Sequence, residues 1–333
     1  MKLDFEHRQS AHCENGVTSN LLRHYGYDLS EPLIYGIGSG LFFAHMPFVK
    51  VNDIPVTSFR PFPGIIFRRV THQLGISIEK KKFRDPERAM KELDEVISQG
   101  IPAGLLVGVY HLTYFPKPYR FHFNAHNIVI YGRENGSYIV SDPIMETPEF
   151  LTYNDLKRVR FARGLFAPHG HMYYATRLPE KIDLQEAVVK GIRKTCKDML
   201  TIPVPMFGVK GIRFMAGKIA RYPQKLGIEK ASLYLGQIIR AQEEIGTGGA
   251  GFRFIYAAFL QQASEITGKD TLMKLSEDMT RVGDQWRLFA VEASRIVKNR
   301  SGENGSYPGI AEILRGIASD EEQIYKKLKG AIS

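Results

Sequence analysis

The sequence lacks the features that mark disulfide-rich secreted proteins and membrane-spanning proteins. It has only two cysteines in 333 residues, Cys13 and Cys196, so a disulfide framework is not expected. Its longest apolar runs, such as residues 103–109, fall far short of the roughly 20 residues that a transmembrane helix requires. The first eight residues carry acidic side chains and no apolar segment of the signal-peptide kind. We therefore expect a cytoplasmic protein without a transmembrane segment, in which a cysteine is free to act as a nucleophile.

The composition is that of an ordinary globular protein, with 44% apolar and 24% charged residues. The length suggests about two domains, each large enough to bury a core. The net charge of +10 permits an anionic partner, such as a nucleic acid, a membrane surface or an acidic protein. The alternative is a solvated basic surface with no specific partner. Because no nucleic-acid-binding module is recognisable, no nucleic-acid partner is expected.

Residues 1–178 predict an α+β domain in which helices precede an antiparallel sheet. Short apolar or alternating runs between turn residues predict the strands, and the Asn135-Gly136 pair predicts a hairpin turn between two of them. A proline at position 179 follows the last strand and marks the seam. The expected helices are 13–25, 63–75 and 85–100, and the expected strands are 103–109, 125–131, 137–141 and 172–177.

Residues 183–333 predict an all-α domain that covers or completes a substrate cleft. Amphipathic periodicity predicts long helices throughout this part, and their apolar faces leave room for a homodimer. The expected helices are 183–200, 211–221, 229–245, 252–266, 269–298 and 308–329.

Three residues of the first domain carry the functional hypothesis: Cys13, His126 and Asp142. Cys13 opens a helix, whose unpaired N–H groups and partial positive charge favour a reactive thiolate. His126 and Asp142 lie on the two strands of the predicted hairpin, which brings them side by side. A histidine can remove and return a proton, and a carboxylate orients it. The order of the three resembles the layout of papain-like catalytic triads.

Further side chains are candidates for binding roles. The backbone N–H of Cys13 is expected to stabilise an oxyanion, with the side chain of Gln9 as the first further candidate and that of Asn15 as the second. The alternative is that these side chains only cap the helix. Arg253, at the edge of an apolar helical stripe, is a substrate-binding candidate for an anionic group.

Two other patterns are expected to carry no cofactor. The run Gly246–Gly251 matches a dinucleotide-binding pattern, yet it follows a helix where that fingerprint requires a strand. The histidines between positions 111 and 171 lack the tight pairing with Cys, Asp or Glu that metal sites need. We therefore expect no metal and no bound cofactor.

The chain resembles the butirosin biosynthesis protein H family, whose N-terminal domain is similar to papain-like cysteine peptidases. The resembling segments are His12-Cys13-Glu14, Ser30-Glu31, residues 36–43, 126–132 and Ser141-Asp142, and, in the second half, residues 246–260 and Trp286.

The resemblance implies an acyltransferase with a Cys13, His126 and Asp142 triad. It would move an acyl or aminoacyl group from a thioester, either on the phosphopantetheine of an acidic acyl carrier protein or on coenzyme A, to a small-molecule amine acceptor. Two alternatives remain open: a cysteine amidase or peptidase with the same triad, and a non-catalytic binding protein that keeps the fold.

Overall fold

The computed structural model describes residues 1–299 and 306–332 and divides the chain into two compact units. The first unit consists of Met1–Ile34 and Phe67–Ile182, and the second of Tyr35–Ile66 and the residues from Asp183 onward. The break after residue 182 lies close to the seam expected from the sequence. The segment Tyr35–Ile66, which the sequence placed in the first domain, belongs to the second unit.

The first unit is built on one antiparallel sheet with the strand order β3-β8-β4-β5-β6-β7. Four of these strands were expected from the sequence, whereas the edge strands β3 and β7 were not, because both are short and partly polar. The bounds are β3 Ser77–Lys81, β4 Ala103–Val107, β5 His126–Glu134, β6 Ser137–Ser141, β7 Glu149–Leu151 and β8 Met172–Arg177.

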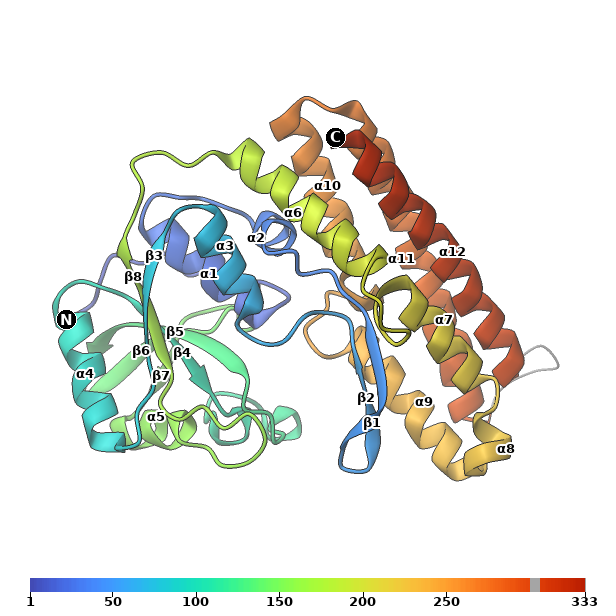
Figure 1. Ribbon diagram of the computed structural model, residues 1–333. Coiled ribbons are helices and arrows are strands. Elements are labelled where there is room, and N and C mark those ends of the chain that lie inside the picture. The colour runs from blue at the N-terminus through green and yellow to red at the C-terminus, as the bar shows by residue number, and fades with distance from the viewer. Residues whose placement is uncertain (300–305, 333) are drawn as a thin grey trace. The chain divides into compact units, whose positions relative to one another are not determined.

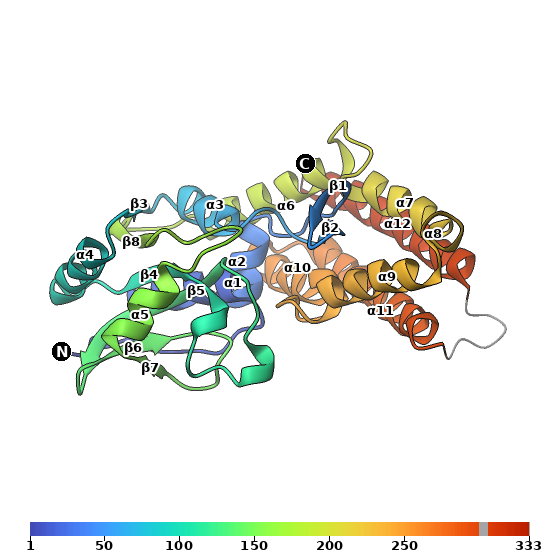
Figure 2. The same ribbon diagram turned by 90° about the horizontal axis from the view of Figure 1, so that it is seen from below.

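Helices cover both faces of this sheet (Figures 1 and 2). On one face, Val17 and Leu21 of α1 and Phe67 of α3 pack against Val129 of β5 and Tyr173 of β8. The other face packs against α4 and α5 in a larger apolar core. The bounds are α1 Cys13–His24, α2 Glu31–Ile37, α3 Ile65–Gln73, α4 Pro86–Ser98 and α5 Tyr153–Arg160. The expected α+β class, with helices packed on an antiparallel sheet in the first unit, is confirmed.

The β5–β6 hairpin forms where the sequence predicts it. Glu134 pairs with Ser137, so the turn consists of two residues, Asn135 and Gly136. Both have positive φ angles, 48° and 80°, which asparagine and glycine adopt more readily than other residues. The hairpin therefore fixes which residues of β5 and β6 lie opposite each other.

The second unit combines long helices with a small hairpin. Strands β1 (Ala44–Val51) and β2 (Ile54–Ser58) pair antiparallel, and the pattern of residues 35–66 did not predict them. The helices largely match the expected ranges: α6 Leu184–Leu200, α7 Gly208–Ile219, α8 Tyr222–Leu226, α9 Ile228–Glu243, α10 Arg253–Thr267, α11 Asp270–Val297 and α12 Tyr307–Ala331. Across the described ranges, no helix is long and apolar enough to cross a bilayer.

A buried carboxylate, Glu321 of α12, joins two other helices of the second unit, α10 and α11, and also bonds within its own helix. It accepts hydrogen bonds from Arg253 Nε and Nη2 (2.9 and 3.1 Å), from Trp286 Nε1 (2.8 Å) and from the Tyr325 hydroxyl (3.1 Å). The guanidinium also lies 4.9 Å from the centre of the Trp286 ring. Trp286 in turn contacts Phe43 and Phe59, which explains why the segment around β1 and β2 belongs to this unit.

This arrangement corrects the role expected for Arg253. The side chain has no solvent exposure, and its remaining amino group, Nη1, donates to the carbonyl of Gly251 at 2.8 Å. The three nitrogens are thus engaged inside the protein, and Arg253 is a structural residue of the core. The preceding loop runs through consecutive positive φ angles, and a Cβ on Gly251 would lie 2.2 Å from the Phe59 ring. Gly251 therefore serves close packing, and Gly246, Gly248 and Gly249 serve the positive φ angles of the loop.

Replacing Glu321 by glutamine is expected to destabilise the second unit strongly. The amide leaves the buried Arg253 without a counter-charge, and breaking a buried pair typically costs about 3–5 kcal/mol. The matched control is Glu322→Gln on the next residue, whose ion pair with Arg213 is partly exposed and is worth about 1 kcal/mol or less. Urea unfolding of both variants measures the difference. Equal losses would contradict the role given to Glu321.

Candidate active site

Cys13 is the first residue of α1 and is 7% exposed. The carboxylate of Glu31 holds the chain just before it, accepting hydrogen bonds from the backbone N–H groups of Ala11 and His12 at 2.9 and 2.8 Å. Burial raises the pKa of Glu31, while these two hydrogen bonds and the Asn15 side chain act to lower it. Glu31 thereby fixes the start of the helix and, with it, the position of the Cys13 thiol.

The first turn of α1 lies directly against the segment that follows Asp142. A Cβ added to Gly16 would lie 2.4 Å from the Cβ of Pro143, so only glycine permits this approach. The backbone N–H of Ser10 also donates to the Pro143 carbonyl at 2.7 Å. Packing thus joins the cysteine-bearing helix to the end of β6.

His126 and Asp142 are in direct contact at the ends of β5 and β6. His126 Nε2 lies 2.7 Å from Asp142 Oδ2, and Asp142 has no solvent exposure. The Tyr114 hydroxyl donates to the same carboxylate oxygen at 2.9 Å, and the backbone N–H of Ile144 donates to Oδ1 at 3.1 Å. The sequence argument missed Tyr114, because it lies in an irregular loop with no local signal of its role.

Electrostatics links this pair to Cys13. Burial acts to lower the pKa of His126. The negative charges of Asp142 and Cys13, and the hydrogen bonds of His126 to both residues, have the larger opposite effect and raise the pKa to about 10. The imidazole is therefore protonated at neutral pH. A protonated imidazole hydrogen-bonded to the sulfur favours the thiolate form of the cysteine. The contact between His126 and Cys13 favours an enzyme over the binding-protein alternative, for which we expected a wide separation.

Asn127, next to His126, is a further polar residue at the cysteine. Its Nδ2 lies 3.9 Å from Cys13 Sγ, and its Oδ1 accepts a hydrogen bond of 2.8 Å from the Tyr173 hydroxyl. Tyr173 thus orients the amide so that Nδ2 lies on the side of the sulfur, and Nδ2 also donates to the carbonyl of Ala125 at 3.4 Å. Asn127 follows His126 directly, and that adjacency to the expected base was the one signal available in the sequence.

The two side chains expected near an oxyanion occupy different environments. Gln9 is exposed, and its Nε2 donates to the carbonyl of Ile144 at 3.3 Å. Asn15 is completely buried in the first turn of α1, and its side chain acts to lower the pKa of Glu31. Their roles at an oxyanion stay predictions.

The other cysteine has a different environment. Cys196 is buried in α6, and burial raises its pKa to about 12, so it remains a thiol at neutral pH. In the part of the chain that the structure describes, no cluster of three or more His, Cys, Asp or Glu side chains could hold a metal ion.

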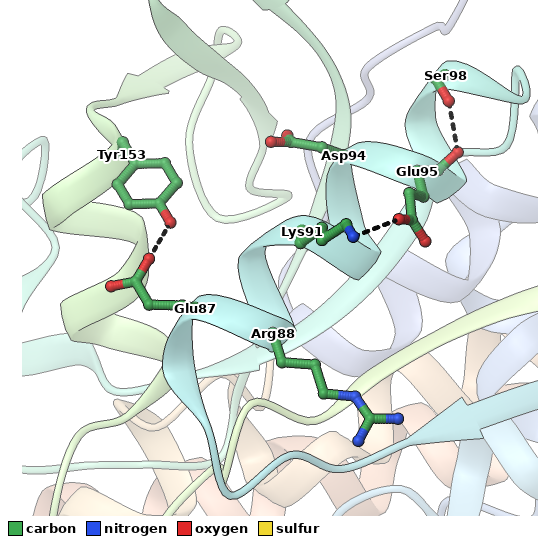
Figure 3. A pocket seen from close by; sticks show the side chains of 7 residues that line it. All are labelled: Glu87, Arg88, Lys91, Asp94, Glu95, Ser98 and Tyr153. Atoms are coloured by element: carbon green, nitrogen blue, oxygen red, sulfur yellow. Dashed lines mark hydrogen bonds and ion pairs between the residues drawn. The ribbon is translucent and has the colours of Figure 1, made fainter.

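The first unit also has a surface hollow of about 660 Å³ along α4, and none of Cys13, His126 and Asp142 lines it (Figure 3). Its charges are mostly paired: Lys91 with Glu95, and Glu87 with the Tyr153 hydroxyl and with Lys157. Asp94 pairs with Arg133. A hollow with such balanced charge offers little to an ionic ligand.

A cysteine at a helix start, beside a histidine and an aspartate on neighbouring strands, gives the first unit the layout of a papain-like cysteine enzyme. Residues 12–143 match the family model described as "Butirosin biosynthesis protein H, N-terminal". Residues 154–328, more than half of the chain, match the model described as "Domain of unknown function (DUF4872)". The chain therefore belongs to the DUF4872 family, and its residues 12–143 are similar to the N-terminal domain of butirosin biosynthesis protein H, as the sequence resemblance implied.

Other comparisons add little. A search of curated proteins found no significant match. Among solved structures, the chain is similar to a crystal structure described as a C39-like peptidase from Bacillus anthracis. The identity is 12% and the TM-score 0.34, over 54% of this chain and 100% of the other. A likeness of this size supports no argument about function.

Alkylation by iodoacetamide at neutral pH is expected to modify Cys13 and to leave Cys196 unmodified in the folded protein. The thiolate is the reactive form, and only Cys13 has a protonated imidazole beside it. Peptide mass spectrometry locates the modified residue, and a Cys196→Ala variant should react at the wild-type rate. Preferential labelling of Cys196 would contradict this description.

Replacing Asp142 by asparagine is expected to slow this alkylation at least about tenfold at neutral pH, the effect of one pKa unit. The amide no longer stabilises the imidazolium that favours the thiolate. Asp94→Asn is the matched control, because Asp94 also accepts a hydrogen bond from a tyrosine, Tyr138, but does not contact His126. Alkylation rates of folded variants, checked by circular dichroism, decide the point. An unchanged rate in Asp142→Asn would exclude the charge coupling.

Proposed function

We propose that the protein is an acyltransferase that moves an acyl or aminoacyl group from a thioester to an amine through a Cys13 acyl-enzyme. The observation that carries the proposal is the contact of Cys13 with His126. The buried Asp142 holds the imidazole, with 2.7 Å between His126 Nε2 and Asp142 Oδ2. The match of residues 12–143 to the butirosin biosynthesis protein H model supports transfer in a biosynthetic setting. Cys13 is the proposed nucleophile, His126 the acid and base, and Asp142 the group that orients it.

In the first half-reaction, the Cys13 thiolate attacks the carbonyl carbon of the thioester. A carbon–sulfur bond to Cys13 forms, the bond to the donor sulfur breaks, and the protonated His126 gives its proton to the leaving thiolate. The backbone N–H of Cys13 and Asn127 Nδ2 are proposed to stabilise the transient oxyanion, with Gln9 and Asn15 as further candidates.

In the second half-reaction, the amine attacks the acyl-enzyme. Acylation removes the negative charge of Cys13, which is one of the factors that raise the pKa of His126. The imidazole, neutral after giving up its proton, accepts a proton from the incoming amine. A carbon–nitrogen bond forms, and the Cys13 thiolate leaves.

The proposed donor is a thioester on the phosphopantetheine of an acidic acyl carrier protein, with coenzyme A as the other source of the same chemistry. The net charge of +10 supports an acidic protein partner, because opposite charge speeds encounter. Transfer to an amine requires that water be excluded from the acyl-enzyme.

Incubation with a panel of acyl-coenzyme A and acyl carrier protein thioesters is expected to add one acyl group to the protein. Intact-protein mass spectrometry should show the adduct on the wild type and on Cys196→Ala, and not on Cys13→Ala. Addition of an amine should discharge the adduct and yield an amide.

The products distinguish the alternatives. An adduct that decays to the free acid at the same rate with and without amines would identify a hydrolase. The absence of an adduct with every thioester, in a protein whose Cys13 still reacts with iodoacetamide, would reject both enzyme functions for these donors.

A further inference from the structure

We propose that the second unit has a binding pocket for a small molecule that carries a phosphate group. The β1–β2 hairpin, α7, α8 and Tyr234 of α9 enclose a cavity of about 470 Å³, within the usual range for small-ligand pockets. Figure 2 shows the hairpin alongside α7 and α9. The inference does not rest on the proposed acyl transfer.

The lining of this pocket is strongly cationic. Five of its residues are basic and none is acidic: Lys50, Arg213, Lys218, Arg221 and Lys225. Arg213 forms an ion pair with Glu322 at 2.6 Å. Within the described ranges, none of the other four has a carboxylate within ion-pair distance. The pocket therefore differs from the hollow along α4, where acidic and basic groups compensate each other (Figure 3).

Three of the four uncompensated cations are close together in the chain. Lys218, in the last turn of α7, precedes Arg221 by three residues and Lys225 of α8 by seven. Like charges gathered around a partly enclosed cavity repel each other and create a positive potential that attracts anions. The buried His45 also lies within this positive potential. Burial and the charge of Lys218 together lower its pKa to about 4. His45 is therefore neutral and does not add to the positive charge.

Hydrogen bonds hold the walls of the pocket in place. The Tyr234 hydroxyl donates to the carbonyl of Asp53 in the hairpin turn at 3.1 Å. His45 Nδ1 lies 2.9 Å from Thr57 Oγ1, and the His45 N–H donates to the Met206 carbonyl at 3.0 Å. A ligand would therefore enter a largely preformed site.

The chemistry of the lining indicates the ligand class. Arg and Lys bind phosphate through charge-assisted hydrogen bonds, and several cations around one cavity suit a doubly charged group better than a single carboxylate. Phe214, Leu226 and Pro47 supply apolar surface beside the cations. The pocket therefore suits a phosphate ester with an apolar or aromatic organic part.

Phenyl phosphate is a suitable probe, and isothermal titration calorimetry with the full chain measures its binding. We expect phenyl phosphate to bind more tightly than inorganic phosphate, and benzoate to bind more weakly than either. The double variant Lys218→Gln/Arg221→Gln should lose at least tenfold in affinity. Its melting temperature should be no lower than that of the wild type, because the substitutions remove charges that repel each other.

The matched control is Lys82→Gln/Arg84→Gln, which removes one lysine and one arginine from exposed positions of the first unit and should bind as the wild type does. No binding of phenyl phosphate, or equal losses in the two double variants, would overturn the proposal. Binding to phosphatidic acid vesicles without binding to phenyl phosphate would also overturn it, in favour of a membrane surface.

Discussion

The hydrogen bond between His126 and the buried Asp142 is the interaction on which the candidate site depends. A carboxylate without solvent is stable as an anion only when donors surround it, and Tyr114, Ile144 and His126 supply them. That anion keeps a proton on His126 in spite of burial, and the proton in turn favours the thiolate of Cys13. The charge state of Cys13, on helix α1, is thus set by a residue at the end of β6.

Packing makes this electrostatic coupling possible. Gly16 allows the first turn of α1 to approach Pro143, and Glu31 holds the backbone just before the cysteine. The two-residue turn at Asn135 and Gly136 and the register shift between Ile130 and Gly132 together set the pairing of the strands that carry His126 and Asp142. Each of these local features positions one member of the group, and the sheet brings the members together.

These features explain how far the sequence could predict the structure. The helix that starts at Cys13 and the Asn-Gly hairpin have local signals, so the three site residues and the long helices were predictable. Tyr114, Asn127 and Tyr173 act through contacts between distant segments, and local patterns do not encode such contacts. Arg253 was misjudged for the same reason, because its partner Glu321 lies 68 positions further along the chain. Likewise, only the packing of Phe43 and Phe59 on Trp286 assigns residues 35–66 to the second unit.

The ultraviolet absorbance of the Cys13 thiolate tests the central claim most directly. The difference spectrum between wild type and Cys13→Ala at neutral pH should contain a thiolate band, which His126→Gln should largely remove. Cys196 does not interfere, because it is a thiol in both proteins. Identical spectra of wild type and Cys13→Ala at neutral pH, with the band emerging only in alkaline solution, would contradict the account.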